Sequence, residues 1–404
     1  MLTGRRYRLE LTSDQQARCE TFAAGCRSVW NTGLEQRRMY RSRGAWINYA
    51  EQAAQLPEAK SEHDWLKSVP AHCLQQTLMD LDRACRTQGT WKVRWRSRRR
   101  WAPSFRFPEG SKIVVERWGR KAGRVKLPKL GWVRFRWSRP LGGKIRSATV
   151  RRDGDRWMVS FLIDDGQARP RCHGRPGSAV GVDRGVSVAV ACSDGATLNG
   201  SFGADGAVAR LRRLQKKLSR QKVNSHNRAD TVGRIRRLRR RERDQRKDFA
   251  AKVAHRIATA NATVVLEDLK IRSMTRSAKG SVNAPGTNVR QKAGLNRAIL
   301  AKGWYQLQLA LEAKARYTGS TIVKVPAAFT SQACSACGAV DARSRKSQAR
   351  FVCTRCDMTL NADINAARNI LAAGLAVTAC GDLDNGRSGK QEPAGNREEL
   401  LPPP

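Results

Sequence analysis

Apolar and polar positions in the second half of the chain alternate between the period of a strand and the period of a helix. Short apolar runs of strand length lie at 179–192, 262–267 and 320–325. Helical periods separate them, at 207–258 and 304–317. The resulting order of strand, hairpin, helix, strand, helix and strand predicts an α/β domain in this half of the chain.

The first half of the chain has a different pattern. Strand-like residues 7–11 precede a helical pattern with capping residues at its start, and helical spacing returns in 51–90. From 112 to 163, short alternating runs are separated by turns such as Asp153-Gly154. A small β-barrel fits these runs better than helices do.

Residues 91–118 mix large aromatic side chains with arginine and lysine. The aromatic residues are Trp91, Trp95, Trp101, Phe105, Phe107 and Trp118. Aromatic and basic side chains together stack bases and hold phosphates. Short strands that turn these rings toward a core fit the pattern at least as well, because large aromatic residues dominate protein cores. Both interpretations stay open at this point.

Changes in pattern divide the chain into five parts. We expect a β-barrel formed by residues 1–11 and 112–170, a helical insert at 12–111, an α/β domain formed by 171–332 and 360–380, a metal-binding segment at 333–359, and a disordered polar tail at 381–404.

The net charge of the chain indicates which kind of partner it binds. The chain has 78 Lys and Arg against 34 Asp and Glu, a net charge of +44. Seventeen of the basic residues lie between 210 and 247. A chain of this charge repels itself unless a polyanion binds it, and nucleic acid is the obvious polyanion. We therefore expect the basic helices at 207–258 to contact phosphates.

Membrane classes are disfavoured. No apolar run reaches the about 18 residues that suggest a transmembrane helix, and the N-terminus lacks the apolar core of a signal peptide. Charge spread along most of the chain also argues against a membrane surface as partner. Eleven cysteines, four of them at metal-ligand spacing, indicate a reducing compartment. We expect a cytoplasmic, nucleoid-associated prokaryotic protein.

The strongest single motif is a pair of CxxC sequences. Cys334 and Cys337 are followed, after fifteen residues, by Cys353 and Cys356. Each CxxC turn places two thiolates on one side of an ion, and Zn²⁺ prefers four tetrahedral ligands. The spacing predicts one structural zinc ion in a zinc ribbon. The other seven cysteines show no metal-ligand spacing, and we expect most of them to pack as small apolar residues.

Three acidic residues occupy informative places in the pattern. Asp183 and Glu267 end apolar runs, and Asp363 opens an apolar helical pattern. Asp is also common in turns and as a helix N-cap, so each position has an ordinary interpretation. The element order equally matches an RNase H-like layout, in which three carboxylates converge at one edge of the sheet. Two Mg²⁺ ions roughly 3.5–4 Å apart would offset their repulsion and hydrolyse a phosphodiester.

Several segments together resemble one family. Val180–Val186 resembles the first RuvC-like motif of the TnpB family, Val265–Leu269 resembles the second, and Asp363–Ile370 resembles the third. Thr330–Gly338 resembles the zinc-binding segment of that family, and Gln16 with Gly25–Asn31 resembles its opening helix. TnpB proteins are transposon-encoded relatives of the type V CRISPR effectors.

The resemblance implies both architecture and activity. It implies a wedge-like N-terminal barrel interrupted by a helical recognition insert, then a RuvC-like nuclease domain with an inserted zinc ribbon. It implies a guide RNA and cleavage of double-stranded DNA beside a short adjacent motif. Asp183, Glu267 and Asp363 would be the catalytic ligands of two Mg²⁺ ions. The guide would read the DNA sequence while the protein reads shape and the short motif.

Three other functions remain open. A miniature type V CRISPR effector would use the same chemistry with a guide RNA from a CRISPR array instead of a transposon end. A non-cleaving RNA-guided DNA-binding repressor would lack part of the acidic set, but Asp183, Glu267 and Asp363 are all present. An unguided nuclease or transposase would leave the large N-terminal half and the high charge without a role.

Overall fold

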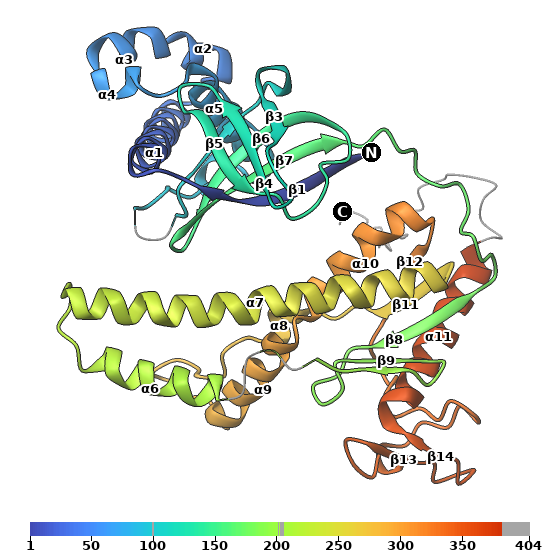
Figure 1. Ribbon diagram of the computed structural model, residues 1–404. Coiled ribbons are helices and arrows are strands. Elements are labelled where there is room, and N and C mark those ends of the chain that lie inside the picture. Colours follow the sequence, from blue (N-terminus) through green and yellow to red (C-terminus); the bar gives the residue numbers. More distant parts are fainter. Residues whose placement is uncertain (99–100, 201, 203–205, 382–404) are drawn as a thin grey trace, which may run out of the picture. The chain divides into compact units, whose positions relative to one another are not determined.

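The computed structural model describes residues 1–98, 101–200, 202 and 206–381 (Figure 1). The chain forms two compact units: residues 1–168 with 214–237, and residues 169–213 with those from 238 onward. Separate hydrophobic cores lie in the two units.

A seven-stranded antiparallel sheet lies at the centre of the first unit. In spatial order its strands are β2 (Ser104–Phe107), β6 (Lys144–Asp153), β7 (Arg156–Asp164), β1 (Leu2–Glu10), β5 (Gly131–Arg136), β4 (Ala122–Leu127) and β3 (Val114–Arg117). The first strand of the chain pairs with β7 over Leu2–Arg8 and with β5 at Leu9 and Glu10, so it joins the two halves of the sheet. Alternate residues of β7 are buried, as expected for a strand with one face on a core.

Five helices follow β1, and α1 (Ser13–Ser42) and α5 (Ala71–Gln88) pack on this sheet. The short helices α2 (Tyr49–Ala54), α3 (Leu56–Glu62) and α4 (Asp64–Lys67) lie between them in the chain, and a 3₁₀ turn (Thr90–Lys92) follows α5. Thr12 caps α1, since its side chain accepts from the Gln15 N–H while the Gln15 side chain accepts from the Thr12 N–H. The ring of Phe22 in α1 meets Phe105 of β2 edge-to-face at 5.5 Å, which fixes α1 on the sheet.

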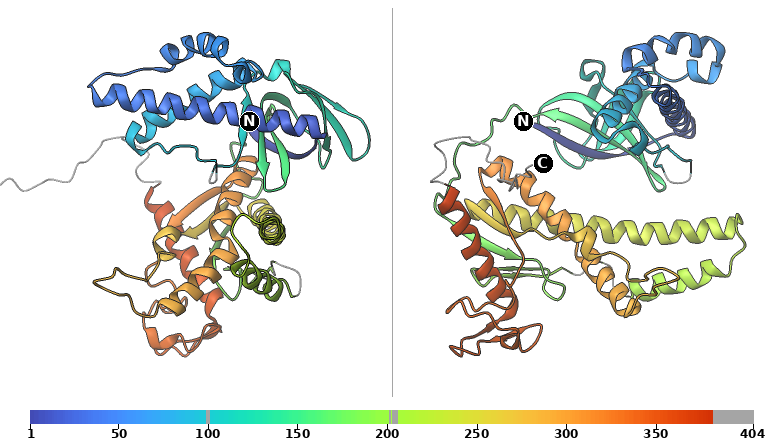
Figure 2. Two further views of the ribbon diagram at one scale, coloured as in Figure 1. Left: turned by 90° about the vertical axis from the view of Figure 1, so that its left-hand side faces the viewer. Right: turned by 180° about the vertical axis from the view of Figure 1, so that it is seen from behind.

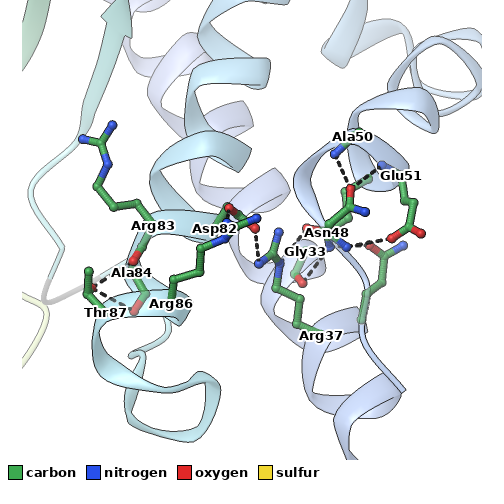
Figure 3. A network of polar contacts seen from close by, with 12 residues as sticks. Gly33, Arg37, Asn48, Ala50, Glu51, Asp82, Arg83, Ala84, Arg86 and Thr87 are labelled. Carbon is green, nitrogen blue, oxygen red and sulfur yellow. Dashed lines mark hydrogen bonds and ion pairs between the residues drawn. The ribbon is translucent and has the colours of Figure 1, made fainter. Parts of the chain in front are cut away.

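A buried ion pair ties three of these helices together (Figure 3). The guanidinium of Arg37 in α1 is 2% exposed and donates to Asp82 of α5 and to Gln52 of α2, both at 2.8 Å. The Gln52 amide in turn donates to the carbonyl of Gly33, one turn earlier in α1. The partners of Arg37 therefore fix the spacing of α1, α2 and α5, since a buried charge without partners is costly.

A five-stranded sheet forms the centre of the second unit. Its spatial order is β10 (Thr197–Leu198), β9 (Val190–Cys192), β8 (Ala179–Asp183), β11 (Thr263–Glu267) and β12 (Thr321–Val325). The last three strands are parallel, while β9 returns antiparallel to β8 as a hairpin. The predicted α/β domain is therefore present, with its strands at the predicted apolar runs.

Helices α7 (His226–Ala260), α10 (Trp304–Thr318) and α11 (Ala362–Gly381) cover the two faces of this sheet. The same half of the chain also contains α6 (Ala207–Ser219), α8 (Ile271–Met274) and α9 (Val289–Lys302). Apolar residues of α7 and α10 pack with Val182 and Leu266 on one face. Ile370 of α11 packs with Val265 and Val325 on the other face. In the left view of Figure 2, strands of the sheet accordingly lie between α11 and α7.

Cysteine-rich residues 333–361, which we call the cysteine segment, separate β12 from α11. The segment contains the short antiparallel pair β13 (Arg350–Val352) and β14 (Thr359–Asn361). Its small core consists of Cys334, Phe351 and Cys353 together with Ala362 of α11. Because β14 runs straight into α11, the segment and the first turn of α11 form one continuous piece of structure.

One sequence-based boundary differs from the structure. The expected helical insert at 12–111 ends earlier, because β2 (Ser104–Phe107) pairs with β6 and belongs to the sheet. Its aromatic residues are divided: Phe105 and Phe107 lie in the core, whereas Trp91, Trp95 and Trp118 are exposed. Each exposed ring faces an arginine, with Arg38 4.9 Å from Trp95 and Arg134 4.7 Å from Trp118. The expected tail lies outside the described residues from 382 onward.

Candidate functional site

Strand alternation places two of the predicted acids on one face of the five-stranded sheet. In β11, Val265 packs on the α11 side, and Glu267, two residues later, projects to that same side. In β8, Gly181 contacts α11, so Asp183 also projects toward α11. The paired residues Val182 and Leu266 are neighbours in the parallel register, so the two acids that follow them lie side by side at the strand ends.

The first turn of α11 brings the third acid to the same edge. The Asp363 Oδ2 atom lies 3.6 Å from where a Cβ on Gly185 would be, and Gly185 is two residues beyond Asp183. Asp363 is not the N-cap of its helix, because Asn361 takes that role by accepting from the N–H groups of Asp363 and Ile364 at 2.9 and 3.2 Å. The Asp363 carboxylate is therefore not used to cap the helix. The residue is nevertheless buried, with only 6% of its surface exposed.

The electrostatics of Asp183 show that the acids repel one another. Burial and, to a smaller extent, the negative charges of Glu267 and Asp363 together raise the pKa of Asp183 to about 7. Burial also raises the pKa of Asp363, opposed by the nearby guanidinium of Arg345. Buried carboxylates that repel one another are stabilised in their charged form when a cation binds to them.

Two residues absent from the sequence-based site hold Glu267 in place. Arg184, 2% exposed, donates from Nη2 to the main-chain carbonyl of Glu267 and from Nη1 to Gln308 of α10 at 3.4 Å. Thr330, on the loop after β12, donates its hydroxyl proton to Glu267 Oε1 at 2.7 Å. An arginine directly after Asp183 in an apolar run was a signal for the first contact, but nothing local in the sequence indicates the second.

Arg345 of the cysteine segment is the third residue that sequence reasoning missed. Its Nη2 lies 3.4 Å from Asp363 Oδ1, and Arg345 also pairs with Phe351 through an isolated β-bridge. The cysteine segment thus places one positive charge directly against the carboxylates. Eighteen residues separate the pair along the chain, so only the fold brings them together.

The four predicted cysteines converge at one point. Their Sγ atoms all lie within 4.8 Å of one another, with Cys334 and Cys356 at 3.7 Å and Cys337 and Cys353 at 3.6 Å. Four thiolates bound at about 2.3 Å to a tetrahedral ion would be roughly 3.8 Å apart, so this set fits such an ion. The N–H groups of Arg355 and Cys356 also lower the pKa of the Cys353 thiol, which favours the thiolate that a metal needs.

The acidic set differs from the cysteine set. Within the described part of the chain, the four cysteines are the one group of three or more metal-ligating residues placed closely enough to hold an ion. Asp183, Glu267 and Asp363 lie at the same sheet edge but do not form such a group in this conformation.

The remaining cysteines mostly behave as packed apolar residues. Cys19, Cys26, Cys73, Cys85 and Cys192 are buried, as expected, while Cys172 is exposed. No described helix is long and apolar enough to cross a membrane.

Three family models match parts of the chain. Residues 1–45 match an OrfB model described as "Helix-turn-helix domain", 167–278 match one described as "Probable transposase", and 304–370 match "Cas12f1-like, TNB domain". The first description does not fit the local structure, since residues 1–45 form β1 and one uninterrupted helix, α1. The third covers α10, β12, the loop that contains Thr330, the cysteine segment with Arg345, and the start of α11 with Asp363.

Two bacterial relatives span nearly the whole chain. "Putative RNA-guided DNA endonuclease InsQ" of Escherichia coli K12 is 38% identical over 395 residues, covering 96% of each chain. "Putative RNA-guided DNA endonuclease" of Streptomyces pristinaespiralis is 31% identical over 410 residues, covering 96% of this chain and 95% of the relative.

A solved structure shares the fold. The cryo-EM structure of the Cas12f1–sgRNA–target DNA complex matches with a TM-score of 0.56 and 15% identity, covering 88% of this chain and 82% of that chain. The likeness establishes a multidomain α/β fold of the same kind. Together with the full-length similarity to InsQ and the matched transposase and TNB models, it shows that the chain belongs to the TnpB family, the transposon-encoded relatives of the miniature type V CRISPR effectors.

Proposed function

We propose that this chain is an RNA-guided DNA endonuclease that hydrolyses double-stranded DNA beside a short adjacent motif. The observation that carries the proposal is the position of Asp183, Glu267 and Asp363 at one sheet edge, where burial and their mutual repulsion raise the pKa of Asp183 to about 7. The name of the InsQ relative, which is similar over nearly its whole length, supports the same activity.

Three residues would act as ligands of two Mg²⁺ ions in this centre. Bound Mg²⁺ ions would supply activation of water and stabilisation of the leaving oxygen of a phosphodiester. Asp183 would lie between its two neighbours and lose its proton on metal binding. Glu267, fixed by Arg184 and Thr330, and Asp363, fixed on the first turn of α11, would complete the ligand set. The carboxyl ends of β8 and β11 therefore define where the DNA backbone reacts.

We assign a structural Zn²⁺ ion to Cys334, Cys337, Cys353 and Cys356. The sulfur spacing supports this assignment. An ion there would hold the ends of the cysteine segment together and keep Arg345 close to Asp363.

The two units would correspond to the domains expected from the TnpB resemblance: a wedge-like barrel with a helical recognition insert, and a RuvC-like nuclease domain with an inserted zinc ribbon.

Guide RNA and target DNA are the proposed partners of the basic surface. Along α6 and the first part of α7, basic side chains far outnumber acidic ones. Only the C-terminal part of α7, including Val253, Ala254 and Ile257, packs into the core of the second unit. The polar part of the helix is thus a phosphate-binding surface, and affinity for RNA should fall steeply as salt rises.

The test is cleavage of a target library with randomised flanks. The full chain is co-expressed with its flanking genomic region, and the co-purified RNA is sequenced and used to design the target. We expect a discrete RNA, Mg²⁺-dependent cuts beside one flank motif, and loss of cutting in Asp183→Ala. Asp194→Asn, in the exposed turn between β9 and β10, is the matched control and should cut normally.

Two results would overturn the proposal. Cutting that needs no RNA would indicate an unguided nuclease. A discrete RNA with bound but uncut DNA would indicate an RNA-guided repressor. Repeats or transposon ends in the neighbouring DNA decide whether the guide comes from a CRISPR array or a transposon end.

A further inference from the structure

Glu267 is held at two points by different parts of the fold. Its main-chain carbonyl accepts from Arg184, the residue directly after β8, and its side chain accepts from the Thr330 hydroxyl at 2.7 Å. Both contacts are buried, since Arg184 is 2% exposed, Thr330 8% and Glu267 8%. The first contact fixes where the residue lies, and only the second acts on the direction in which its carboxylate points.

The Thr330 hydroxyl has two acceptors in reach but only one proton. The Glu267 oxygen is 2.7 Å away, whereas the carbonyl of Ala327 is 3.2 Å away. A charged acceptor at the shorter distance takes the proton, because hydrogen bonds to ionised groups are shorter and stronger. The hydrogen bond occupies one lone pair of Oε1 and leaves the lone pairs of Oε2 for a cation.

Thr330 is itself fixed by α11, the helix that begins with Asp363. The Asn369 amide donates to the carbonyls of Thr330 and Ala333 at 2.9 and 2.7 Å. One turn earlier, the Asn365 amide donates to the same Ala333 carbonyl and accepts from the Ser335 N–H. Two asparagines therefore bind α11 to the segment from Thr330 to Ser335, which contains Cys334.

The backbone before Thr330 is also in an unusual conformation. Phe329 has a φ of 61°, in the left-handed region that costs a non-glycine residue roughly 1–2 kcal/mol. Its carbonyl accepts from the N–H groups of Gln332 and Ala333, both at 2.9 Å. Strain of this kind persists where the surrounding structure requires it, and here it turns the chain so that Thr330 faces Glu267.

We propose that Thr330 is a positioning residue that sets the orientation of the Glu267 carboxylate for a bound divalent cation. The inference rests on the proposed function. It adds a role for the Thr330–Glu267 hydrogen bond that the proposed function does not itself require. The turn leading into Cys334, fastened to α11 by Asn365 and Asn369, carries the group that aims Glu267. The Thr330 hydroxyl therefore links the folding of the cysteine segment to the position of the Glu267 carboxylate.

The test compares three variants by Mn²⁺ binding. Thr330→Val removes the hydroxyl with little change in shape, and Thr330→Ser keeps the hydroxyl. Thr77→Val is the matched control, because Thr77 is a buried threonine (5% exposed) whose hydroxyl donates to a backbone carbonyl in α5. Free Mn²⁺ is followed by electron paramagnetic resonance during titration of the full chain with its co-purified RNA. Binding to the Asp183→Ala complex is subtracted to remove ions held by RNA.

We expect Thr330→Val to weaken Mn²⁺ binding by about 10-fold or more, the range seen when a hydrogen bond to a metal ligand is lost. Thr330→Ser should restore binding, and Thr77→Val should equal the wild type. Cleavage should respond in parallel, with a higher Mg²⁺ requirement in Thr330→Val. The thiolate-to-metal absorption of Co²⁺ bound to the cysteine segment should be the same in Thr330→Val and wild type. If valine disturbs that absorption, Thr330→Ala is titrated in its place with the same expectation.

Two negative outcomes are distinguishable. Tight Mn²⁺ binding by Thr330→Val, or equal weakening by the serine and valine variants, would overturn the role of the hydroxyl while leaving the nuclease intact. A wild-type complex that binds no more Mn²⁺ than Asp183→Ala would overturn the proposed metal centre, and this inference with it.

Discussion

Gly181 lies so close to α11 that a Cβ on it would be 2.0 Å from the carbonyl oxygen of Ala367. No side chain fits between β8 and the helix at this point, and the obstacle is backbone, which cannot rotate away. The contact sets the depth at which α11 crosses the sheet. It therefore also sets where Asp363, one turn before Ala367, lies relative to Asp183 at the end of β8.

Gly181→Ala should displace α11 and separate the carboxylates. We expect a loss of about 1–3 kcal/mol in the free energy of unfolding, the usual range for overpacking, and a larger proportional loss of cleavage. Denaturant unfolding measures the first quantity and single-turnover cleavage the second. Gly233→Ala, at an open position within α7, is the control and should be neutral or slightly stabilising. Wild-type behaviour of Gly181→Ala would contradict the close contact.

Stability without divalent cations should fall as pH rises from about 4 to 7. The folded-state pKa of Asp183 is about 7, above its ordinary value of 3.8, so between these values the folded chain holds a proton that the unfolded chain releases. Raising the pH through this window removes that proton and destabilises the folded state. Asp183→Asn should flatten this part of the profile, and Mg²⁺ should do so in the wild type. Thermal melts at several pH values measure both, and identical slopes for variant and wild type would refute the prediction.

Arg345→Gln should matter most when Mg²⁺ is absent. Arg345 supplies the positive charge against Asp363, so its loss removes one of the charges that oppose the repulsion among the carboxylates. The pair is only partly buried, and we expect a loss of about 1 kcal/mol in metal-free protein. Added Mg²⁺ should close most of this gap, because it supplies the missing positive charge. Thermal melts with and without Mg²⁺ make the comparison, and an equal loss in both conditions would show that Arg345 acts through packing alone.

Arg37→Met should destabilise the first unit strongly. Removal of Arg37 takes the buried partner from Asp82, which keeps only the more exposed Arg86 at 2.8 Å, so we expect a loss of about 3 kcal/mol, the low end of the range for a broken buried pair. The double variant with Asp82→Leu should recover part of that loss. Arg18→Met, which removes an exposed pair with Asp14, should cost less than about 1 kcal/mol. Urea unfolding of the four proteins tests the contrast, which fails if the two single variants lose equal stability.

The purified chain should contain one tightly bound zinc per molecule. Cys337→Ser removes one of four thiolates and should lower the metal content measured by mass spectrometry, since serine is a poor ligand for Zn²⁺. Cys172→Ser is the control, because Cys172 is exposed and lies outside the cluster. Full zinc content in Cys337→Ser would show that the metal, if any, binds elsewhere.

Local patterns predicted most of the elements of the second unit. The apolar runs around Asp183 and Glu267 are strands β8 and β11, and the apolar pattern at Asp363 is helix α11. The CxxC spacing predicted the convergence of the four cysteines, because two short turns leave few ways to arrange four thiols around one point. These inferences succeeded because the information lies within a few residues of each position.

Local sequence patterns did not predict the domain boundaries and the long-range contacts as well. Residues 104–107 seemed to belong to a helical insert, but pairing with β6, some forty residues later in the chain, makes them a strand. The mixed aromatic pattern at 91–118 was open for the same reason: Phe105 faces a core and Trp118 does not, and the difference depends on which elements pack nearby. Tertiary packing overrides local preference in such segments.

The sequence by itself determined the identity of the acids, the four thiolates, the basic helices and the order of elements, because each is encoded by residue type and local spacing. Only the tertiary structure decided that Arg184, Thr330 and Arg345 contact those acids. Thr330 and Glu267 are separated by 63 residues, and a hydrogen bond between them exists only when β11, β12 and α11 are packed together. Contacts of this kind depend on the relative positions of whole elements, which follow from the burial of their apolar faces on both sides of the sheet.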